Sequence, residues 1–172
     1  MKDRSPASPH YLFALLLLGA STAAAAGEKN LATAFDWTLG TWAGVRIDVA
    51  SGRRAPMTMR VEPILGGAGQ IRHIEVEPGD DAYYGFAVQV LDAERSLWIR
   101  QYTNAGRGTF SLLEGEVKDE RTSVWRGASP GRSRESRLLS ERLGQDGWRR
   151  TMSISEDGGE TWQDLWIDKL ER

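Results

Sequence analysis

Cysteine is absent from this chain of 172 residues, and histidine occurs only at His10 and His73. The lack of cysteine excludes disulfides, thiolate metal ligands and a cysteine nucleophile. It also excludes a lipid-modified cysteine as a membrane anchor. So few histidines rule out a multi-histidine metal site and restrict a Ser-His-Asp triad to His73. We therefore expect no metal ion, no cofactor and no catalytic residue of these classes.

Long hydrophobic runs are scarce as well. The strongly apolar run 11–20 (YLFALLLLGA) is about half the roughly 20 residues that a membrane helix needs. A basic start (MKDR) precedes it, and small residues (STAAAA) follow at 21–26. This order predicts a secretory signal peptide over 1–26, cleaved after Ala26. An uncleaved membrane anchor is the alternative, and the predicted location is the periplasm or the exterior of the cell.

No excess of one charge is present, since the net charge is −2. A nearly balanced domain has no electrostatic attraction for nucleic acid or for an anionic membrane, so neither is expected as a partner. Residues 27–172 are predicted to form one domain without a stable membrane anchor. A chain of that length can bury a sufficient core without disulfides.

Helical patterns are rare in this domain. Leu31, Phe35 and Leu39 recur at four-residue spacing, and Gly40 follows as a stop, so one short helix is expected over 31–40. The remaining chain alternates β-forming segments with Gly, Pro, Asn and Asp turns. Ten strands are predicted, near 42–49, 56–63, 69–77, 83–91, 96–103, 108–117, 121–128, 135–143, 147–155 and 161–170.

The short gaps between these strands determine the expected fold. Parallel crossovers need a dozen or more residues, so neighbouring strands must pair antiparallel. A sheet of about ten strands tends to close on itself and thereby lose its exposed edges. We predict an all-β, up-and-down barrel with the N-terminal helical segment closing one end, and with a two-sheet sandwich as the alternative. A ten-stranded barrel also has room for a cavity.

Three segments carry a resemblance to a known family: FDWTLGTW at 35–42, LWIRQYTN at 97–104 and SEDGGETW at 155–162. As a set they resemble bacterial exported lipocalin-like (calycin-type) barrels, most of which have no assigned function. The first segment is also similar to the Gly-x-Trp of lipocalins, in which the tryptophan closes one end of the barrel. The resemblance implies that Trp42 has this role, that a small-molecule pocket exists, and no particular activity.

The segment 155–162 also fits the Asp-box of sialidase-type propellers. In that device an aspartate caps a tight turn and a tryptophan packs beneath it. Propellers repeat the motif, whereas this chain has it once and has no internal repeat. We interpret Asp157 and Trp162 as parts of a structural turn.

Strand alternation sorts the aromatic residues by face. In 83–91, the residues Tyr84, Phe86, Val88 and Val90 share one face, which is expected to be buried. In 96–103, Trp98, Arg100 and Tyr102 share one face, opposite Leu97, Ile99 and Gln101. Alternation does not decide which of these two faces lines the cavity, and the family resemblance favours the side of Trp98 and Tyr102.

Five residues are predicted to bind a ligand, because they combine aromatic bulk with a cation on single strand faces. Arg137 is included because it shares a face with Leu139 and Glu141. Such a lumen suits an amphipathic acid, because arginine binds carboxylates bidentately and stacks on aromatic rings. The alternative places the arginines outside the barrel, with their stems over tryptophan rings. The predicted set is Trp98, Arg100, Tyr102, Trp125 and Arg137.

The leading functional interpretation is a non-enzymatic exported barrel that binds a small apolar or amphipathic molecule. An isomerase or cyclase is the enzymatic alternative, with Glu114, Glu141, Tyr102 and His73 as acid–base candidates. A haem barrel that uses His73 as its axial ligand is another alternative. A structural domain with a filled barrel is the last.

Overall fold

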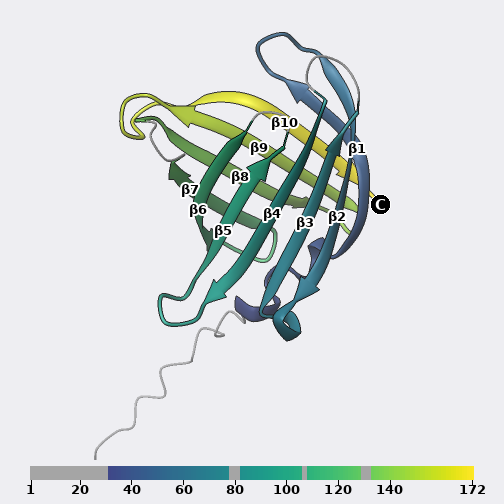
Figure 1. The fold of residues 1–172 in the computed structure, drawn as a ribbon, viewed down its shortest axis with the longest axis vertical. Coiled ribbons are helices and arrows are strands. Elements are labelled where there is room, and N and C mark those ends of the chain that lie inside the picture. The colour runs from purple at the N-terminus through teal and green to yellow at the C-terminus, as the bar shows by residue number, and fades with distance from the viewer. Residues whose placement is uncertain (1–30, 78–81, 106–107, 129–132) are drawn as a thin grey trace, which may run out of the picture.

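The computed structural model describes residues 31–77, 82–105, 108–128 and 133–172. The predicted signal peptide over 1–26 lies outside these residues. The described chain forms a closed antiparallel barrel (Figure 1), in which each strand pairs with the next along the chain and β1 also pairs with β10.

The ten strands coincide with the ten predicted segments to within two residues at each end. The prediction of an antiparallel barrel is therefore confirmed, and the two-sheet sandwich is wrong because the hydrogen bonds between β1 and β10 complete one continuous sheet. The strands are β1 (Gly40–Asp48), β2 (Arg54–Ile64), β3 (Gly69–Val76), β4 (Tyr83–Asp92), β5 (Leu97–Asn104), β6 (Thr109–Val117), β7 (Thr122–Ala128), β8 (Glu135–Leu143), β9 (Gly147–Ser155) and β10 (Gln163–Glu171).

The N-terminal segment differs from its prediction. Instead of one helix over 31–40, two short 3₁₀ turns form, η1 (Leu31–Thr33) and η2 (Asp36–Thr38); a third, η3 (Leu65–Gly67), joins β2 to β3. The hydroxyl of Thr38 donates to the carbonyl oxygen of Phe35 at 2.7 Å, a side-chain bond that competes with helix propagation. Leu39 is already extended, and the chain enters β1 at Gly40.

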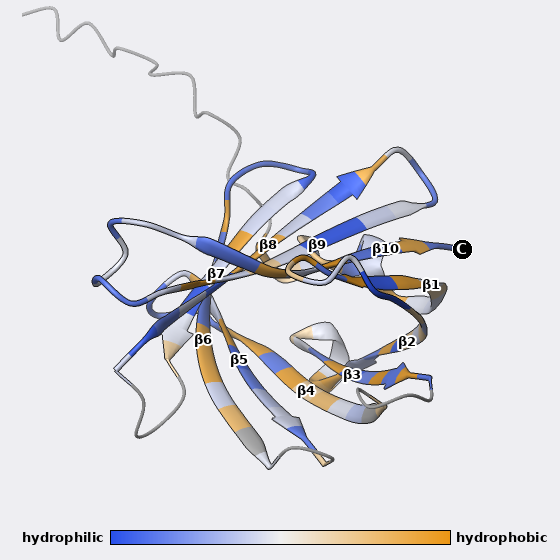
Figure 2. Ribbon diagram, turned by 90° about the horizontal axis from the view of Figure 1, so that it is seen from above, coloured by the Kyte–Doolittle hydropathy of each residue, from blue (hydrophilic) through white to orange (hydrophobic). Residues whose placement is uncertain are grey.

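Hydrophilic and hydrophobic residues alternate along several strands (Figure 2). On β4 the alternation is the reverse of the prediction, because Tyr84 and Phe86 lie on the outer face and are 67% and 37% exposed. Gly85, Ala87 and Gln89 are the inward residues. The barrel needs small side chains here, since the ring of Tyr102 from β5 packs against Gly85. Hydrophobicity alone therefore assigned the wrong face.

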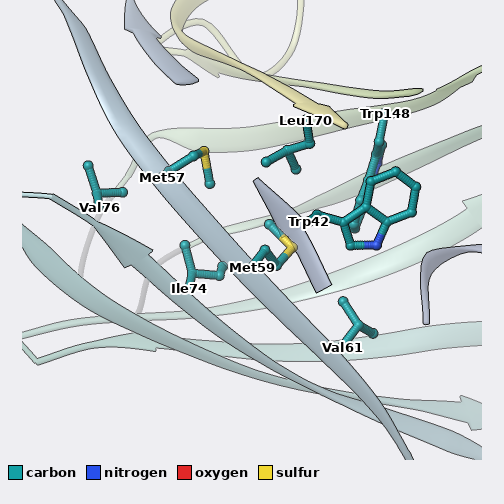
Figure 3. Packing of buried hydrophobic residues seen from close by; sticks show 8 residues of the cluster. All are labelled: Trp42, Met57, Met59, Val61, Ile74, Val76, Trp148 and Leu170. Carbon is teal, nitrogen blue, oxygen red and sulfur yellow. The ribbon is translucent and has the colours of Figure 1, made fainter. Parts of the chain in front are cut away.

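Five aromatic side chains fill one end of the barrel, which we call the base: Phe35, Trp42, Trp98, Trp125 and Trp148. Each is at most 2% exposed. Trp42 and Trp148 meet edge-to-face with ring centroids 5.3 Å apart (Figure 3). Phe35 lies 5.1 Å from Trp98 and 5.4 Å from Trp125. Odd-numbered strands all run in one direction, so the inward residues of their first halves meet at the same end of the barrel.

The turn between β9 and β10 has the hydrogen bonds of a structural Asp-box. Asp157 accepts bonds from the hydroxyls of Ser155 and Thr161 and from the backbone N–H of Thr161. The indole of Trp162 donates to the carbonyl of Gly159 at 3.0 Å. These bonds, the Ser155 bond first, lower the pKa of the Asp157 carboxyl. The motif folds a hairpin turn here, as the sequence predicts.

Candidate functional site

A cavity of about 230 Å³ occupies the barrel half opposite the base. Its wall is mainly apolar and aromatic, and arginines contribute most of its charge. The apolar and aromatic lining residues are Ala55, Ile74, Val76, Ala87, Tyr102, Leu113, Leu138, Met152 and Trp166; the polar and charged ones are Asn104, Ser111, Arg46, Asp48, Arg53, Arg72, Arg100 and Arg150.

Three of these arginines, Arg72, Arg100 and Arg150, lie between the base and the cavity, and we call them the arginine layer. They come from β3, β5 and β9 and are 1%, 2% and 4% exposed. On β5 and β9 the arginine follows a base tryptophan by two residues, as Arg100 follows Trp98. This period of two directs each guanidinium inward, immediately above the base.

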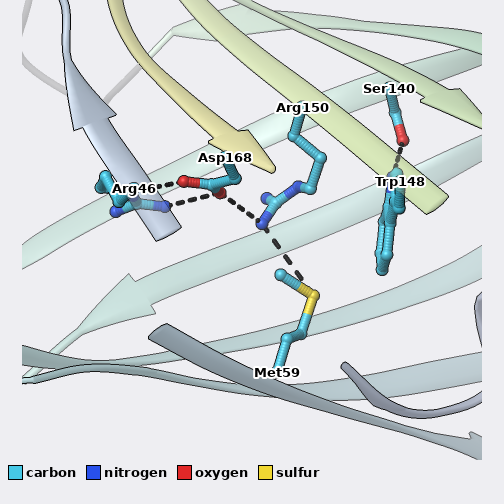
Figure 4. Close-up of polar contacts among 6 residues, drawn as sticks. All are labelled: Arg46, Met59, Ser140, Trp148, Arg150 and Asp168. Carbon is cyan, nitrogen blue, oxygen red and sulfur yellow. Dashed lines mark hydrogen bonds and ion pairs between the residues drawn. The ribbon is translucent and has the colours of Figure 1, made fainter. Parts of the chain in front are cut away.

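One carboxylate neutralises one side of the layer. Asp168, which is fully buried, accepts a bidentate pair of bonds from Arg46 at 2.7 and 2.8 Å (Figure 4). It also accepts a bond from Nη1 of Arg150 at 3.1 Å. This planar, two-oxygen recognition is the geometry for which arginine is best suited.

Arg72 and Arg100 have neutral partners instead. The guanidinium of Arg100 donates twice to the amide oxygen of Gln89, at 3.1 and 2.7 Å. Gln89 donates to the amide oxygen of Gln70 at 3.0 Å, and Nη2 of Arg72 donates to the same oxygen at 3.3 Å. This amide chain positions the two guanidiniums but contributes no negative charge.

Tryptophan rings make cation–π contacts with arginines of the cavity. The guanidinium carbon of Arg100 lies 3.7 Å from the ring centroid of Trp125, and that of Arg46 lies 3.9 Å from Trp166. Cations are attracted to the negative face of such rings, most strongly to tryptophan. Gly115 makes the arrangement possible, because a Cβ there would collide with the ring of Trp125.

The charged state of the layer is unfavourable in this environment. Burial, and then the neighbouring charge of Arg150, lowers the pKa of Arg72. Burial also lowers the pKa of Arg100, followed by the charges of Arg72 and Arg150. Guanidiniums nevertheless stay protonated in proteins, so the layer holds cations that repel one another in a dry interior.

The structure brings some of the predicted binding residues together. Arg100 and Tyr102 line the cavity, and Trp125 lies directly beneath Arg100. Trp98 lies deeper, in the base, where its indole donates to the carbonyl of Leu31 at 3.1 Å.

Arg137 is on the outer side of the barrel and does not line the cavity. Its guanidinium lies 4.3 Å from the ring centroid of Trp162 and donates to the hydroxyl of Ser153 at 3.4 Å. Leu138, its neighbour on β8, is the residue that points inward and is 2% exposed. The prediction that Arg137 faces the lumen is wrong, because its partly apolar face is covered from outside by the turn that carries Trp162.

Of the acid–base candidates, Tyr102 alone lines the cavity. The pKa of its hydroxyl is raised, and burial is the main cause. Glu114 pairs with Arg95, and Glu141 with Arg149, both on the outer surface. His73 is also outside and contacts the ring of Phe86 edge-on at 5.4 Å. A lumenal haem therefore has no axial histidine among the described residues.

Arg72, Arg150 and Asp168 were not selected from the sequence, although the alternation of their strands gives some indication that they face the lumen. Arg72 is flanked on its face by Gln70 and Ile74, and Arg150 by Trp148 and Met152. Arg100 was selected from the sequence because a cation shares a strand face with aromatic bulk. The same combination occurs on β9, where Trp148 precedes Arg150 by two residues. Asp168 lies between Trp166 and Leu170 in the same way.

No family model matches this sequence, and no match was found among curated proteins. In the described part of the chain no helix has the length and apolar character of a membrane span. The same residues contain no group of three or more acidic, histidine or cysteine side chains that could hold a metal ion. The fold and the lumen are therefore the basis for assigning a function.

Proposed function

We propose that the protein is an exported lipocalin-like barrel that binds a small amphipathic molecule in its lumen. The observation that carries this proposal is the composition of the cavity: an apolar wall with a buried polar layer at its inner end. Binding sites for small molecules characteristically combine a mostly apolar lining with a few converging polar groups. Export through a signal peptide over 1–26, and kinship with bacterial exported barrels, are parts of the same proposal.

The size of the cavity defines the size of the molecule. Drug-sized ligands occupy pockets of about 300–1,000 Å³. A lumen of about 230 Å³ is below that range, so the ligand is smaller than a typical drug or has a tail that extends into solvent.

A pair of adjacent residues on β4 tests lumenal binding. Ala87 lines the cavity, whereas Val88 points to the outer face. Ala87→Phe fills the cavity and is expected to abolish the uptake of a neutral amphiphile such as octan-1-ol, whereas Val88→Phe leaves it unchanged. Titration calorimetry measures the binding, and circular dichroism verifies the fold of both variants. Equal binding by Ala87→Phe, Val88→Phe and the wild type would overturn the proposal.

Export is tested separately. Intact-mass analysis of the exported protein is expected to give a chain that begins at Gly27. A membrane-bound chain that retains Met1 would show that the apolar run serves as an anchor.

A further inference from the structure

Four buried nitrogen atoms of the arginine layer donate no hydrogen bond to any described residue. They are Nε and Nη1 of Arg72, Nη1 of Arg100 and Nε of Arg150. In the same layer, Nη2 of Arg72, Nε and Nη2 of Arg100 and Nη1 of Arg150 donate hydrogen bonds at 2.7 to 3.3 Å. Each of the three guanidinium groups therefore combines bonded nitrogens with at least one unbonded nitrogen.

The charges of the lumen are unbalanced in the same place. Arg46, Arg53, Arg72, Arg100 and Arg150 line the cavity, and the partly exposed carboxylate of Asp48 interacts with Arg53. Among the described residues that contact the other four arginines, the one buried carboxylate is Asp168. It binds Arg46 and Arg150, whereas the hydrogen bonds of Arg72 and Arg100 within the described residues go to amide oxygens and to no carboxylate. A buried charge without a counter-charge is strongly destabilising. The lumen therefore has an excess of buried positive charge at Arg72 and Arg100.

We propose that the arginine layer is a binding site for the carboxylate head of a small amphipathic acid, held chiefly by Arg72 and Arg100. This inference rests on the proposed function and specifies the ligand class of that same lumen. A carboxylate accepts up to four hydrogen bonds on its two oxygens, enough for donors from both guanidiniums.

Asp168 shows that this lumen can hold a carboxylate. Its two oxygens take three bonds from two guanidiniums of the same cavity, at 2.7, 2.8 and 3.1 Å. An acid bound on Arg72 and Arg100 would form a second carboxylate–arginine unit beside the first. It would also lower the repulsion among Arg72, Arg100 and Arg150.

The rest of the cavity determines the orientation and size of the acid. The layer adjoins the base, so the head lies at the inner end and the apolar body lies along Ile74, Leu138 and Met152 toward the open end. Liquid water occupies about 30 Å³ per molecule. The lumen of about 230 Å³ therefore holds about eight groups of that size, which corresponds to a short-chain acid.

Three amphiphiles with one tail and different heads test the inference on the wild-type protein: octanoate, octan-1-ol and octylamine. Calorimetry at neutral pH is expected to show the order octanoate, then octan-1-ol, then octylamine. The acid should bind at least about tenfold more tightly than the alcohol, because a charge-assisted bond in a dry site is stronger than a neutral one. Equal affinities for all three would overturn the inference and leave lumenal binding intact. Binding of none would overturn the proposed function itself.

Substitutions locate the head group. Arg72→Gln and Arg100→Gln are each expected to weaken octanoate binding by roughly tenfold to a hundredfold and to leave octan-1-ol within about twofold. Arg137→Gln, outside the lumen, is the matched control and should change neither affinity. Loss of affinity for acid and alcohol alike would indicate a damaged cavity and would contradict a head-group role. If either glutamine variant fails to fold, the wild-type head-group series still decides the inference.

Discussion

The base and the arginine layer are adjacent levels of one barrel, built by the same alternation, yet they satisfy their polar groups differently. In the base, all four tryptophan indoles have a partner. Trp42 donates to the carbonyl of Thr38 at 2.7 Å, and Trp148 donates to the hydroxyl of Ser140 at 2.8 Å. One level above, Arg72 leaves two nitrogens without a partner.

This difference suggests different roles for the two levels: the base stabilises the fold, and the arginine layer serves the proposed binding. A filled aromatic level with every N–H bonded stabilises the fold, since it buries large apolar area without leaving a polar group unpaired. A level of buried guanidiniums lowers stability until a complementary anion is bound. We therefore expect substitutions in the two levels to have opposite effects on the ligand-free protein.

Trp42→Ala should have the largest effect. The side chain is fully buried against Trp37 and Trp148, so its removal leaves a large cavity in the base. The expected loss of unfolding free energy is about 4 kcal/mol. Urea denaturation measures it, with Phe86→Ala on the outer face as the control, which should lose less than about 1 kcal/mol. An unchanged midpoint for Trp42→Ala would refute the role of the base.

Asp168→Asn should have the next largest effect on the unfolding free energy. The change removes the buried charge that neutralises Arg46 and Arg150, and breaking a buried pair on one side costs about 3 kcal/mol. Glu141→Gln, which breaks the surface pair with Arg149, is the control and should cost at most about 1 kcal/mol. Equal midpoints for the two variants in urea would show that the lumenal pair is as well solvated as the surface pair.

Arg72→Met should have the opposite sign. It replaces a buried cation that has two unpaired nitrogens with an apolar side chain of similar length, and it relieves repulsion with Arg100 and Arg150. The ligand-free protein is expected to gain about 1 kcal/mol of unfolding free energy. Thermal and urea unfolding measure the gain. A loss of unfolding free energy of similar size would show that Arg72 stabilises the fold, as the residues of the base do.

Asp157→Asn should give the smallest effect, and that effect depends on pH. The folded turn lowers the pKa of the Asp157 carboxyl below its value in the unfolded chain. Its ionised form therefore adds stability above a pH of about 4, and the contribution is lost as the pH falls through the folded-state pKa. The wild type should melt slightly above Asp157→Asn at neutral pH, and the difference should shrink below about pH 4. A difference independent of pH would contradict this origin.

Local patterns predicted most of the fold. Turn residues separated the ten strands, and their short gaps allowed only antiparallel pairing. The face of β4 was wrong because the tyrosine and phenylalanine at 84 and 86 are more hydrophobic than Gly85 and Ala87. Burial there depends on the space that Tyr102 leaves, which is a property of the neighbouring strand. The helix over 31–40 was wrong because the Thr38 hydroxyl bonds to Phe35 and to Gln70, 32 residues away.

The candidate site was predicted in part. Arg100 and Tyr102 line the cavity. Alternation placed them on one face with Trp98 but did not decide which face is inward, and the family resemblance favoured this one. Arg137 was misplaced because the turn with Trp162 covers its strand from outside, a contact that periodicity within β8 does not contain. Whether the lining residues bind a ligand stays a prediction.

The sequence by itself determined that the chain forms ten strands and that neighbouring strands pair antiparallel. These properties follow from period, turn chemistry and residue type, all of which are local. Only the tertiary structure decided that Arg72, Arg100 and Arg150 meet at one level and that Asp168 neutralises just one side of it. That balance arises from strands far apart in the sequence, because barrel closure brings their inward side chains into one enclosed space.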